Sequence, residues 1–327
     1  MLLKPALVED VFGRTQITYD EFGPFHVASW GILERGRHIA ERGESPLIDQ
    51  VGSLLSSETE AGQQDVLASV APSDGPDFVS LLVFTVESRH SSEYGSGEFF
   101  FSEEVARVGR VTVETARALH VDREHLALAL FQYAVILYGD LPRSEDEVLR
   151  NLNEVCALYE EVPALEVGAA LAYEWLGFAQ QMLGDYSAAR EAFLASSEWL
   201  SQMPETHDAN LLFLARHGKL LSLRNAARAS IRLGEYEEAL RLLDQAEGLG
   251  DEARLLLDQV QAERVPDTDT ADLRAEALLA LGHIRDALDV FREQAADEFS
   301  KPSWRASFTP ILNLAASLVL ILSLIHI

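Results

Sequence analysis

Two histidines and an aspartate, His120, Asp122 and His125, lie close together in the sequence. Imidazole nitrogens and carboxylate oxygens are the donors that zinc and related metals bind. No fourth ligand at metal-binding spacing accompanies them, and the segment separates two apolar stretches. We therefore interpret it as a helix boundary with surface histidines and predict no metal site.

Cys156 is the single cysteine of the chain, so the sequence excludes an intramolecular disulfide and any multi-cysteine zinc or iron-sulfur site. Its thiolate would be a nucleophile, but its neighbours Val155, Ala157 and Leu158 are apolar. This context favours a small buried residue. A single cysteine also fits a reducing compartment, and we expect the protein in the cytoplasm.

The segment 267–272, DTDTAD, has the alternating carboxylates of a calcium-binding loop. Ala271 stands where a ligand is needed, the sixth position lacks glycine, and Leu278 replaces the closing glutamate. A polar loop that leads into a helix N-cap is the better interpretation. The sequence also lacks the common phosphate-binding, dinucleotide-binding, serine-hydrolase and zinc-protease motifs. We predict no catalytic residue, no cofactor and no metal, and hence no enzyme.

One stretch of the chain is cationic. Residues 209–234 contain no Asp or Glu but include Arg216, Lys219, Arg224, Arg228 and Arg232. The last three, here called the arginine stripe, are four residues apart and share one face of a helix. Their guanidinium groups suit the carboxylates of an acidic peptide or an acidic C-terminus. Alternatively the stripe pairs with acidic residues of neighbouring helices, namely Glu191, Glu198, Asp269, Asp272 and Glu276.

A pattern recurs in the second half of the chain: a glycine, a bulky residue two positions later, an alanine five later and a large apolar residue nine later. Glycine after an apolar helix ends that helix in the left-handed conformation. The alanine is small because two antiparallel helices cross there. The copies are Gly184, Tyr186, Ala189 and Phe193; Gly234, Tyr236, Ala239 and Leu243; Gly282, Ile284, Ala287 and Phe291; and a degenerate one at Gly139, where Ser144 replaces the alanine.

With these residues the sequence resembles the tetratricopeptide repeat (TPR) family, whose helix-turn-helix units stack into a superhelix. Segment 171–200 matches best, with signature positions at Tyr173, Leu176, Gly177, Gly184, Tyr186, Ala189 and Phe193. The glycines at 139, 184, 234 and 282 are 45, 50 and 48 residues apart, whereas the family repeats at about 34 residues. The resemblance covers residues 111–296 and implies an all-α, right-handed helix-pair solenoid of elongated TPR-like units.

The resemblance also implies a function. A TPR-like protein is expected to be a scaffold that binds a partner protein or peptide on its concave surface. The family places ligand-contacting residues on the first helix of each unit, and Arg224, Arg228 and Arg232 match such groove-facing positions. Two alternatives stay open: the sensor or regulatory half of a signalling protein, and an enzyme of unrecognised type.

Apolar periodicity predicts the helices that position these residues. We expect one long helix over 210–233 and an added helix over 251–263 that Pro266 closes. Further helices are predicted over 25–41, 47–55 and 78–87. We thus divide the chain into a divergent helical N-terminal region, residues 1–97, and TPR-like helical repeats, residues 98–321. Aromatic residues at helical spacing are expected in the core, namely Phe131, Tyr133, Tyr138, Tyr173, Trp175 and Phe178.

The net charge limits the partners. With 53 acidic and 26 basic residues the chain carries −27, which repels phosphate backbones and anionic lipids, so we expect neither nucleic acid nor a membrane as partner. Excess acid with scarce lysine resembles proteins of salt-loving archaea. Residues 311–327 form an apolar run, but the last six, Leu322 to Ile327, resemble a translated sequencing adapter. We treat residues 322–327 as an artefact and expect a buried helix before them.

Overall fold

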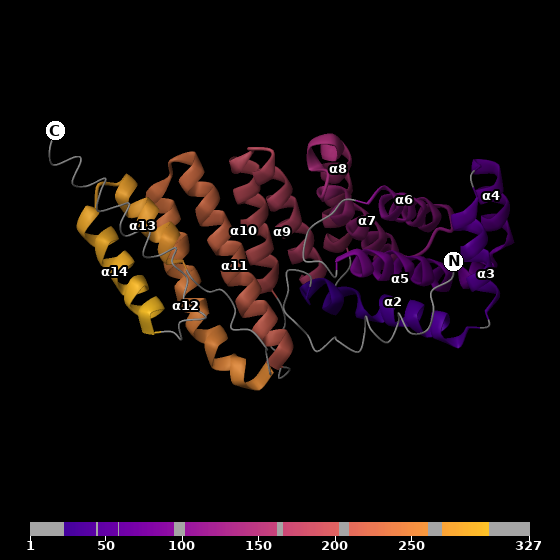
Figure 1. Cartoon of the computed structure of the whole chain (residues 1–327), viewed down its shortest axis with the longest axis horizontal. Helices are drawn as coiled ribbons and strands as arrows, with labels where there is room; N and C mark the ends of the chain where they lie inside the picture. The colour runs from indigo at the N-terminus through magenta and orange to yellow at the C-terminus, as the bar shows by residue number, and fades with distance from the viewer. Residues whose placement is uncertain are drawn as a thin grey trace. The chain divides into compact units, whose positions relative to one another are not determined.

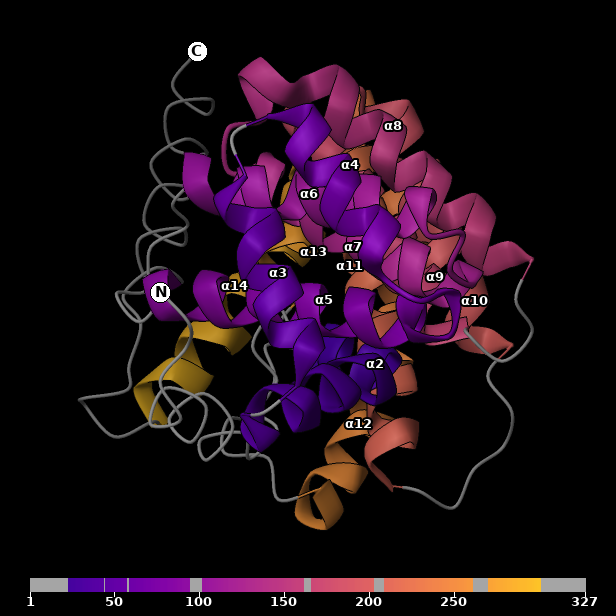
Figure 2. The ribbon, with the colours of Figure 1, turned by 90° about the vertical axis from the view of Figure 1, so that its right-hand side faces the viewer.

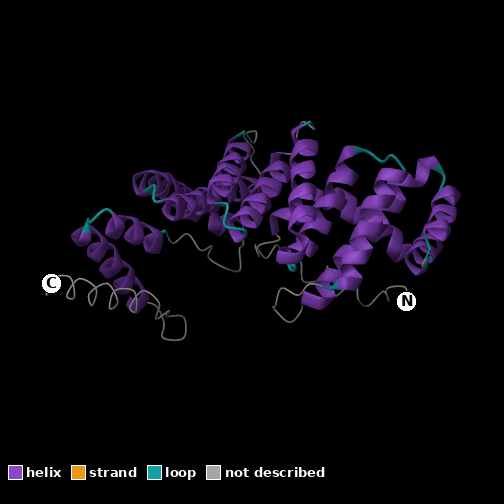
Figure 3. Cartoon of the chain, turned by 90° about the horizontal axis from the view of Figure 1, so that it is seen from above, coloured by secondary structure: helices purple, strands orange, loops and turns teal. Residues whose placement is uncertain are grey.

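The computed structural model of the chain describes residues 23–43, 45–57, 59–94, 102–161, 166–202, 209–260 and 270–300. Within these ranges every regular element is a helix and none is a strand (Figure 3). The all-α prediction is therefore confirmed. The run over 311–327, Asp269 and the prolines at 163, 204, 266 and 302 lie outside the described residues.

Two compact units divide between Leu183 and Gly184. In the first unit, consecutive helices from α5 to α9 pack against one another, and α2 packs on α5 and on α9. The predicted boundary at residue 97 falls in residues 95–101, outside the described part. The helices of this unit are α2 (Gly23–Arg42), α3 (Pro46–Ser56), α4 (Glu60–Ser69), η1 (Pro72–Asp74), α5 (Gly75–Tyr94), α6 (Glu103–Ala118), α7 (Arg123–Tyr138), α8 (Leu141–Glu160) and α9 (Glu166–Met182).

Most of the largest fully buried side chains of the first unit come from α5 and α7, including Phe78, Phe84 and Leu128. Helix α2 approaches α5 closely at Gly36, where a Cβ atom would lie 2.2 Å from the carbonyl oxygen of Ser80. The predicted helices over 25–41, 47–55 and 78–87 are confirmed as α2, α3 and α5. Helix α4 was not predicted, because it has no buried residue and only a weak apolar periodicity.

The second unit shows the same order of sequential packing. Each of its helices packs on the next, and α11 also contacts α13 (Figures 1 and 2). These helices are α10 (Tyr186–Ser201), α11 (Ala209–Leu233), α12 (Tyr236–Val260), α13 (Ala271–Ala280) and α14 (Ile284–Ser300).

The recurring glycine pattern forms turns between consecutive helices. Gly184, Gly234 and Gly282 have φ of +84°, +80° and +81°, the left-handed conformation that the sequence predicts. The alanines of the three copies, Ala189, Ala239 and Ala287, are all 0% exposed. In the last copy Ala287 packs in one cluster with Ala275 of the preceding helix and with Phe291. The small residues are therefore buried as the helix-crossing interpretation requires.

The degenerate fourth copy differs. Gly139 has φ of −61° and ψ of −19°, so the chain turns there without a left-handed residue. Helix α8 begins two residues later, with Pro142 in its first turn. The hydroxyl of Ser144, which replaces the alanine, donates to the carbonyl oxygens of Leu137 and Asp140 at 2.8 and 2.9 Å. These bonds, one to the last turn of α7 and one to the residue that precedes α8, stabilise a different turn.

The long helices of the second unit confirm one prediction and correct another. Helix α11 spans Ala209–Leu233, as predicted. The separate helix predicted over 251–263 is wrong, because α12 continues without a break from Tyr236 to Val260. Single glycines such as Gly248 cost a helix only about 1 kcal/mol each, and no proline interrupts this stretch.

No single helix in the described ranges has the length and hydropathy of a membrane span. Among the described residues, the consecutive segments Glu60–Ser69 and Pro72–Arg89 meet these criteria when combined, and they are bent by 98° relative to each other.

Candidate functional site

The arginine stripe lies along α11, a helix without acidic residues. Arg224 and Arg228 are half-buried and Arg232 is exposed. The Nε atom of Arg224 is buried. Arg232 lies in the last turn, where the partial negative charge of the helix end favours a cation. The structure therefore places the three predicted residues on one helix, as the sequence requires.

The cations of α11 face different surroundings. Arg216 forms an ion pair with Glu252 of α12, with Nε and Oε2 2.9 Å apart. Arg228 donates from Nη1 to Oδ1 of Asn225 at 3.2 Å, and Asn225 is itself buried. A buried amide that holds one nitrogen of the fork helps to fix the orientation of this guanidinium. Arg216 thus serves the contact between α11 and α12, whereas Asn225 orients Arg228 of the stripe.

The acidic residues that could pair with the stripe lie on the helices next to α11. Glu191 and Glu198 are exposed on α10, Asp272 and Glu276 are exposed on α13, and Asp269 lies outside the described residues. Among the side chains that the structure describes, neither Arg232 nor Glu276 takes part in an ion pair. Ligand binding and internal pairing both remain predictions for the stripe as a whole.

The set His120, Asp122 and His125 is a helix boundary, as predicted. Asp122 is the N-cap of α7, and its Oδ1 accepts from the backbone N–H of His125 at 3.1 Å. His120 is exposed in the turn before it, with φ of +51°. The prediction of surface histidines is wrong for His125, which is only 6% exposed. Both of its ring nitrogens have polar partners, which makes the burial of an imidazole tolerable.

His125 connects Asp122 to Ser80 of α5. Its Nδ1 lies 2.7 Å from Oδ1 of Asp122, and its Nε2 lies 3.1 Å from the hydroxyl oxygen of Ser80. Burial raises the pKa of Asp122, but hydrogen bonds from the ring and the backbone of His125 outweigh it and lower that pKa. Ionised Asp122 can only accept, so Nδ1 donates, and in the neutral ring Nε2 accepts from Ser80. This order of groups is that of a serine hydrolase triad.

The burial of the three groups is opposite to that of a catalytic triad. Ser80 is 0% exposed, and its backbone carbonyl lies beneath Gly36 of α2. The side chain of Asp122 is 54% exposed. A nucleophile must reach its substrate, and a triad carboxylate is normally the buried member. The arrangement therefore ties α5 to the N-terminus of α7. Sequence reasoning missed Ser80, since it lies 45 residues from His125.

Cys156 is buried in α8, as its apolar neighbours predict. Burial raises the pKa of its thiol to about 12, and Glu160 one turn away adds to the rise. At neutral pH the thiol is protonated and a poor nucleophile.

The aromatic residues of the first unit gather around Trp175 of α9. Its ring makes edge-to-face contacts with Tyr138, Phe178 and Phe131, with centroids 5.2, 6.2 and 6.4 Å apart. Trp175 and Phe131 are buried, and so is Tyr133, whose pKa burial raises to about 12. Tyr138 and Phe178 are half-buried members of this cluster, and Tyr173 is half-buried with its hydroxyl donating to Glu160. The core interpretation of these aromatic residues is confirmed for the buried members.

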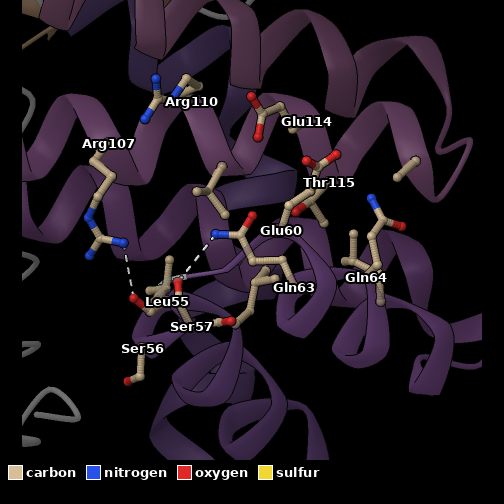
Figure 4. Close-up of a pocket in the computed structure, with 14 residues that line it drawn as sticks. Leu55, Ser56, Ser57, Glu60, Gln63, Gln64, Arg107, Arg110, Glu114 and Thr115 are labelled. Atoms are coloured by element: carbon tan, nitrogen blue, oxygen red, sulfur yellow. Dashed lines mark hydrogen bonds between the residues drawn. The ribbon is translucent and has the colours of Figure 1, made fainter.

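Sequence reasoning did not find an open groove of about 1030 Å³ between the α3–α4 pair and α6 (Figure 4). Arg107 donates from Nη1 to the carbonyl oxygen of Leu55 at 3.0 Å and so satisfies the C-terminal end of α3. The rest of the lining mixes Arg110 with Glu60, Glu114 and several uncharged polar groups. Both signs of charge are present, so the groove selects no class of ligand by its electrostatics.

No group of three or more histidines, cysteines or carboxylates in the described ranges could hold a metal ion. Thr270 is the N-cap of α13, as the N-cap interpretation of segment 267–272 predicts. Its hydroxyl donates to Glu247 of α12 at 2.8 Å and accepts no hydrogen bond from the N–H groups of α13.

Comparison with known proteins adds no relative. No protein-family model matches the chain. A search of curated proteins likewise gave no match. The candidate site therefore has to be judged on its own geometry and charge.

Proposed function

We propose that the protein is an interaction scaffold that binds a partner protein or peptide through the arginine stripe of α11. The observation that carries this proposal is a partly exposed row of like charge on a helix that has no acidic residue of its own. A row of like charges repels itself and costs folding energy, so an external anion would stabilise it.

The chemistry of the stripe suits carboxylates. Each guanidinium presents a planar fork of donors that matches a carboxylate in bidentate fashion. Three guanidinium groups in a row on one helix face can contact successive carboxylates of one peptide, which favours a peptide over a small anion as the ligand. In the TPR-like interpretation the same positions face the concave surface, which supports this choice of partner.

A charge-removal experiment tests the proposal. We expect the variant Arg224→Ser, Arg228→Ser, Arg232→Ser to bind a fluorescent peptide of alternating glutamate and serine at least about tenfold more weakly than the unmodified protein, since each exposed pair contributes roughly 0.5–1 kcal/mol. Fluorescence anisotropy measures the dissociation constant, and thermal unfolding is measured in parallel.

A matched control removes three other exposed arginines of the second unit, Arg241, Arg285 and Arg292. This control changes the net charge equally and should leave binding nearly unchanged. Absence of peptide binding in the unmodified protein, or equal affinity of the two triple variants, would refute the proposal. A large loss of thermal stability in the stripe variant would instead support internal pairing of the arginines and overturn it.

A further inference from the structure

Helices α11 and α13 have matching positions when residues are counted back from the glycine that follows each helix. Each ends at a left-handed glycine, Gly234 after α11 and Gly282 after α13. An alanine that is 0% exposed lies seven residues before each glycine, at Ala227 and Ala275. Another lies five residues before each glycine, at Ala229 and Ala277. Identical burial at identical distances from the turn means that corresponding positions of the two helices face the same way.

At the stripe positions the two helices carry opposite charge. Arg228 lies six residues before Gly234, and Glu276 lies six residues before Gly282. Arg224 and Asp272 correspond in the same way at ten residues. Since α11 and α13 contact each other, a cationic row on one helix runs beside an anionic row on the other.

The anionic row keeps a charge for an outside partner. Glu276 is exposed, and within the described part of the chain its carboxylate forms no ion pair. The basic residue of the same helix turns elsewhere: Arg274 binds Asp244 and Glu247 of α12 at 2.6 and 2.9 Å. The structure thus directs the cation of α13 toward α12 and leaves the stripe position of α13 negative.

We propose that the partner of this surface is an extended segment in which acidic and basic residues alternate. The acidic residues contact the arginines of α11, and the basic residues contact Glu276 and Asp272 of α13. Arginines four residues apart on a helix are about 6 Å apart along its axis. Side chains two residues apart in an extended chain are about 6.6 Å apart and point to the same side, while the residue between them points to the other side.

The net charge of the chain favours such a segment over a purely acidic one. At −27 the protein repels an anionic partner at long range. Basic residues in the partner remove this repulsion and meet the anionic row at short range. This inference depends on the proposed function, because it assigns the sequence of the peptide that the arginine stripe binds.

Two peptides of equal length and equal glutamate content test the inference, one alternating glutamate with lysine and one alternating glutamate with serine. The variant is Glu276→Lys, because Glu276 is exposed and its replacement should not disturb folding. We expect the glutamate–lysine peptide to bind the unmodified protein more tightly. The variant should bind this peptide about threefold or more weakly and should bind the glutamate–serine peptide more tightly than the unmodified protein does. Glu293→Lys, an exposed glutamate of α14, is the matched control: it changes the net charge equally, so it should leave the glutamate–lysine peptide nearly unchanged and strengthen the glutamate–serine peptide only slightly.

The outcomes separate the two proposals. If Glu276→Lys strengthens the binding of both peptides or leaves it unchanged, the inference that the partner alternates acidic and basic residues is refuted. The proposal that the arginine stripe binds an acidic peptide is then unaffected. If neither peptide binds, or if removal of the three stripe arginines has no effect on either, the proposed function fails and the present inference fails with it. A peptide with the same residues in two blocks, glutamates first and lysines second, should bind more weakly than the alternating one, and equal affinity would also refute the alternation.

Discussion

His125 illustrates how much of a side chain's role depends on residues distant in the sequence. Its spacing to Asp122 is a local feature and correctly marks the start of α7. Its burial depends on Ser80, which only the packing of α5 against α7 brings within hydrogen-bond distance. The three groups reproduce the order of a hydrolase triad, yet the hydroxyl is the inaccessible member. Burial, and not the order of donors and acceptors, decides that this arrangement is structural.

The first prediction concerns the charge of Asp122. Hydrogen bonds from His125 lower the pKa of Asp122 below its usual 3.8, so ionised Asp122 contributes stability at neutral pH that is lost as the pH falls through the lowered pKa. Asp122→Ala should reduce the free energy of unfolding at pH 7 by about 1–2 kcal/mol, because the N-cap is lost as well. Urea unfolding at a series of pH values measures the effect.

The control for this prediction is Ser102→Ala, which removes the N-cap of α6 in the same unit, a hydroxyl cap that carries no charge. Its effect on stability should not change with pH, whereas the deficit of Asp122→Ala should shrink under acidic conditions below about pH 4. A deficit of Asp122→Ala that stayed constant with pH would show that His125 does not act through the carboxylate.

At the scale of helices, local signals were predictable and non-local ones were not. The left-handed turns at Gly184, Gly234 and Gly282 could be predicted because a glycine and the apolar residues around it lie within one segment. Gly139 escaped the pattern because Ser144 and Pro142 supply a different turn. The stripe could be placed on one helix from its spacing alone. Its counterpart on α13 could not be paired with it, since the contact between α11 and α13 depends on packing across the intervening α12.

Two glycines of the second unit predict opposite effects of the same substitution. Gly234 has φ of +80°, and no atom lies within 4 Å of the position that a Cβ atom would take, so Gly234→Ala carries only backbone strain and should cost about 1–2 kcal/mol. Gly248 lies inside α12, also with open space around it, and Gly248→Ala should stabilise by about 0.5–1 kcal/mol. Chemical unfolding of the two variants measures both changes. Equal signs would mean that one of the two backbone conformations is wrong.

The crossing of α11 and α12 predicts a further cost. Ala239 is 0% exposed, so Ala239→Leu forces three additional carbon atoms into a filled space and should reduce stability by about 1–3 kcal/mol. Ala280→Leu, on an exposed position of α13, adds the same atoms without crowding and serves as the control. Thermal unfolding compares the two. If the variant at Ala239 were as stable as the control, the helices would not cross at this alanine.

At the scale of the whole molecule the excess of negative charge is the dominant electrostatic feature. The ion pairs in the described ranges are mostly exposed, for example Arg117 with Glu154 and Arg292 with Asp289. Pairs of this kind contribute roughly 0–1 kcal/mol each and weaken with salt. Self-repulsion at a net charge of −27 also weakens with salt, and this change favours the folded state. The two effects have opposite signs, so the response to salt shows which is larger.

We expect repulsion to outweigh the ion pairs. Raising sodium chloride from about 0.05 M to about 1 M should then raise the midpoint of thermal unfolding by roughly 5 °C. Screening is nearly complete once the Debye length falls to about 3 Å, so the rise of the midpoint should level off toward 1 M sodium chloride. Sucrose is the comparison, because a solute that is excluded from the protein surface raises the midpoint steadily with its concentration. If the midpoint falls as sodium chloride is added, the ion pairs stabilise the folded state by more than the repulsion among its 27 surplus negative charges destabilises it.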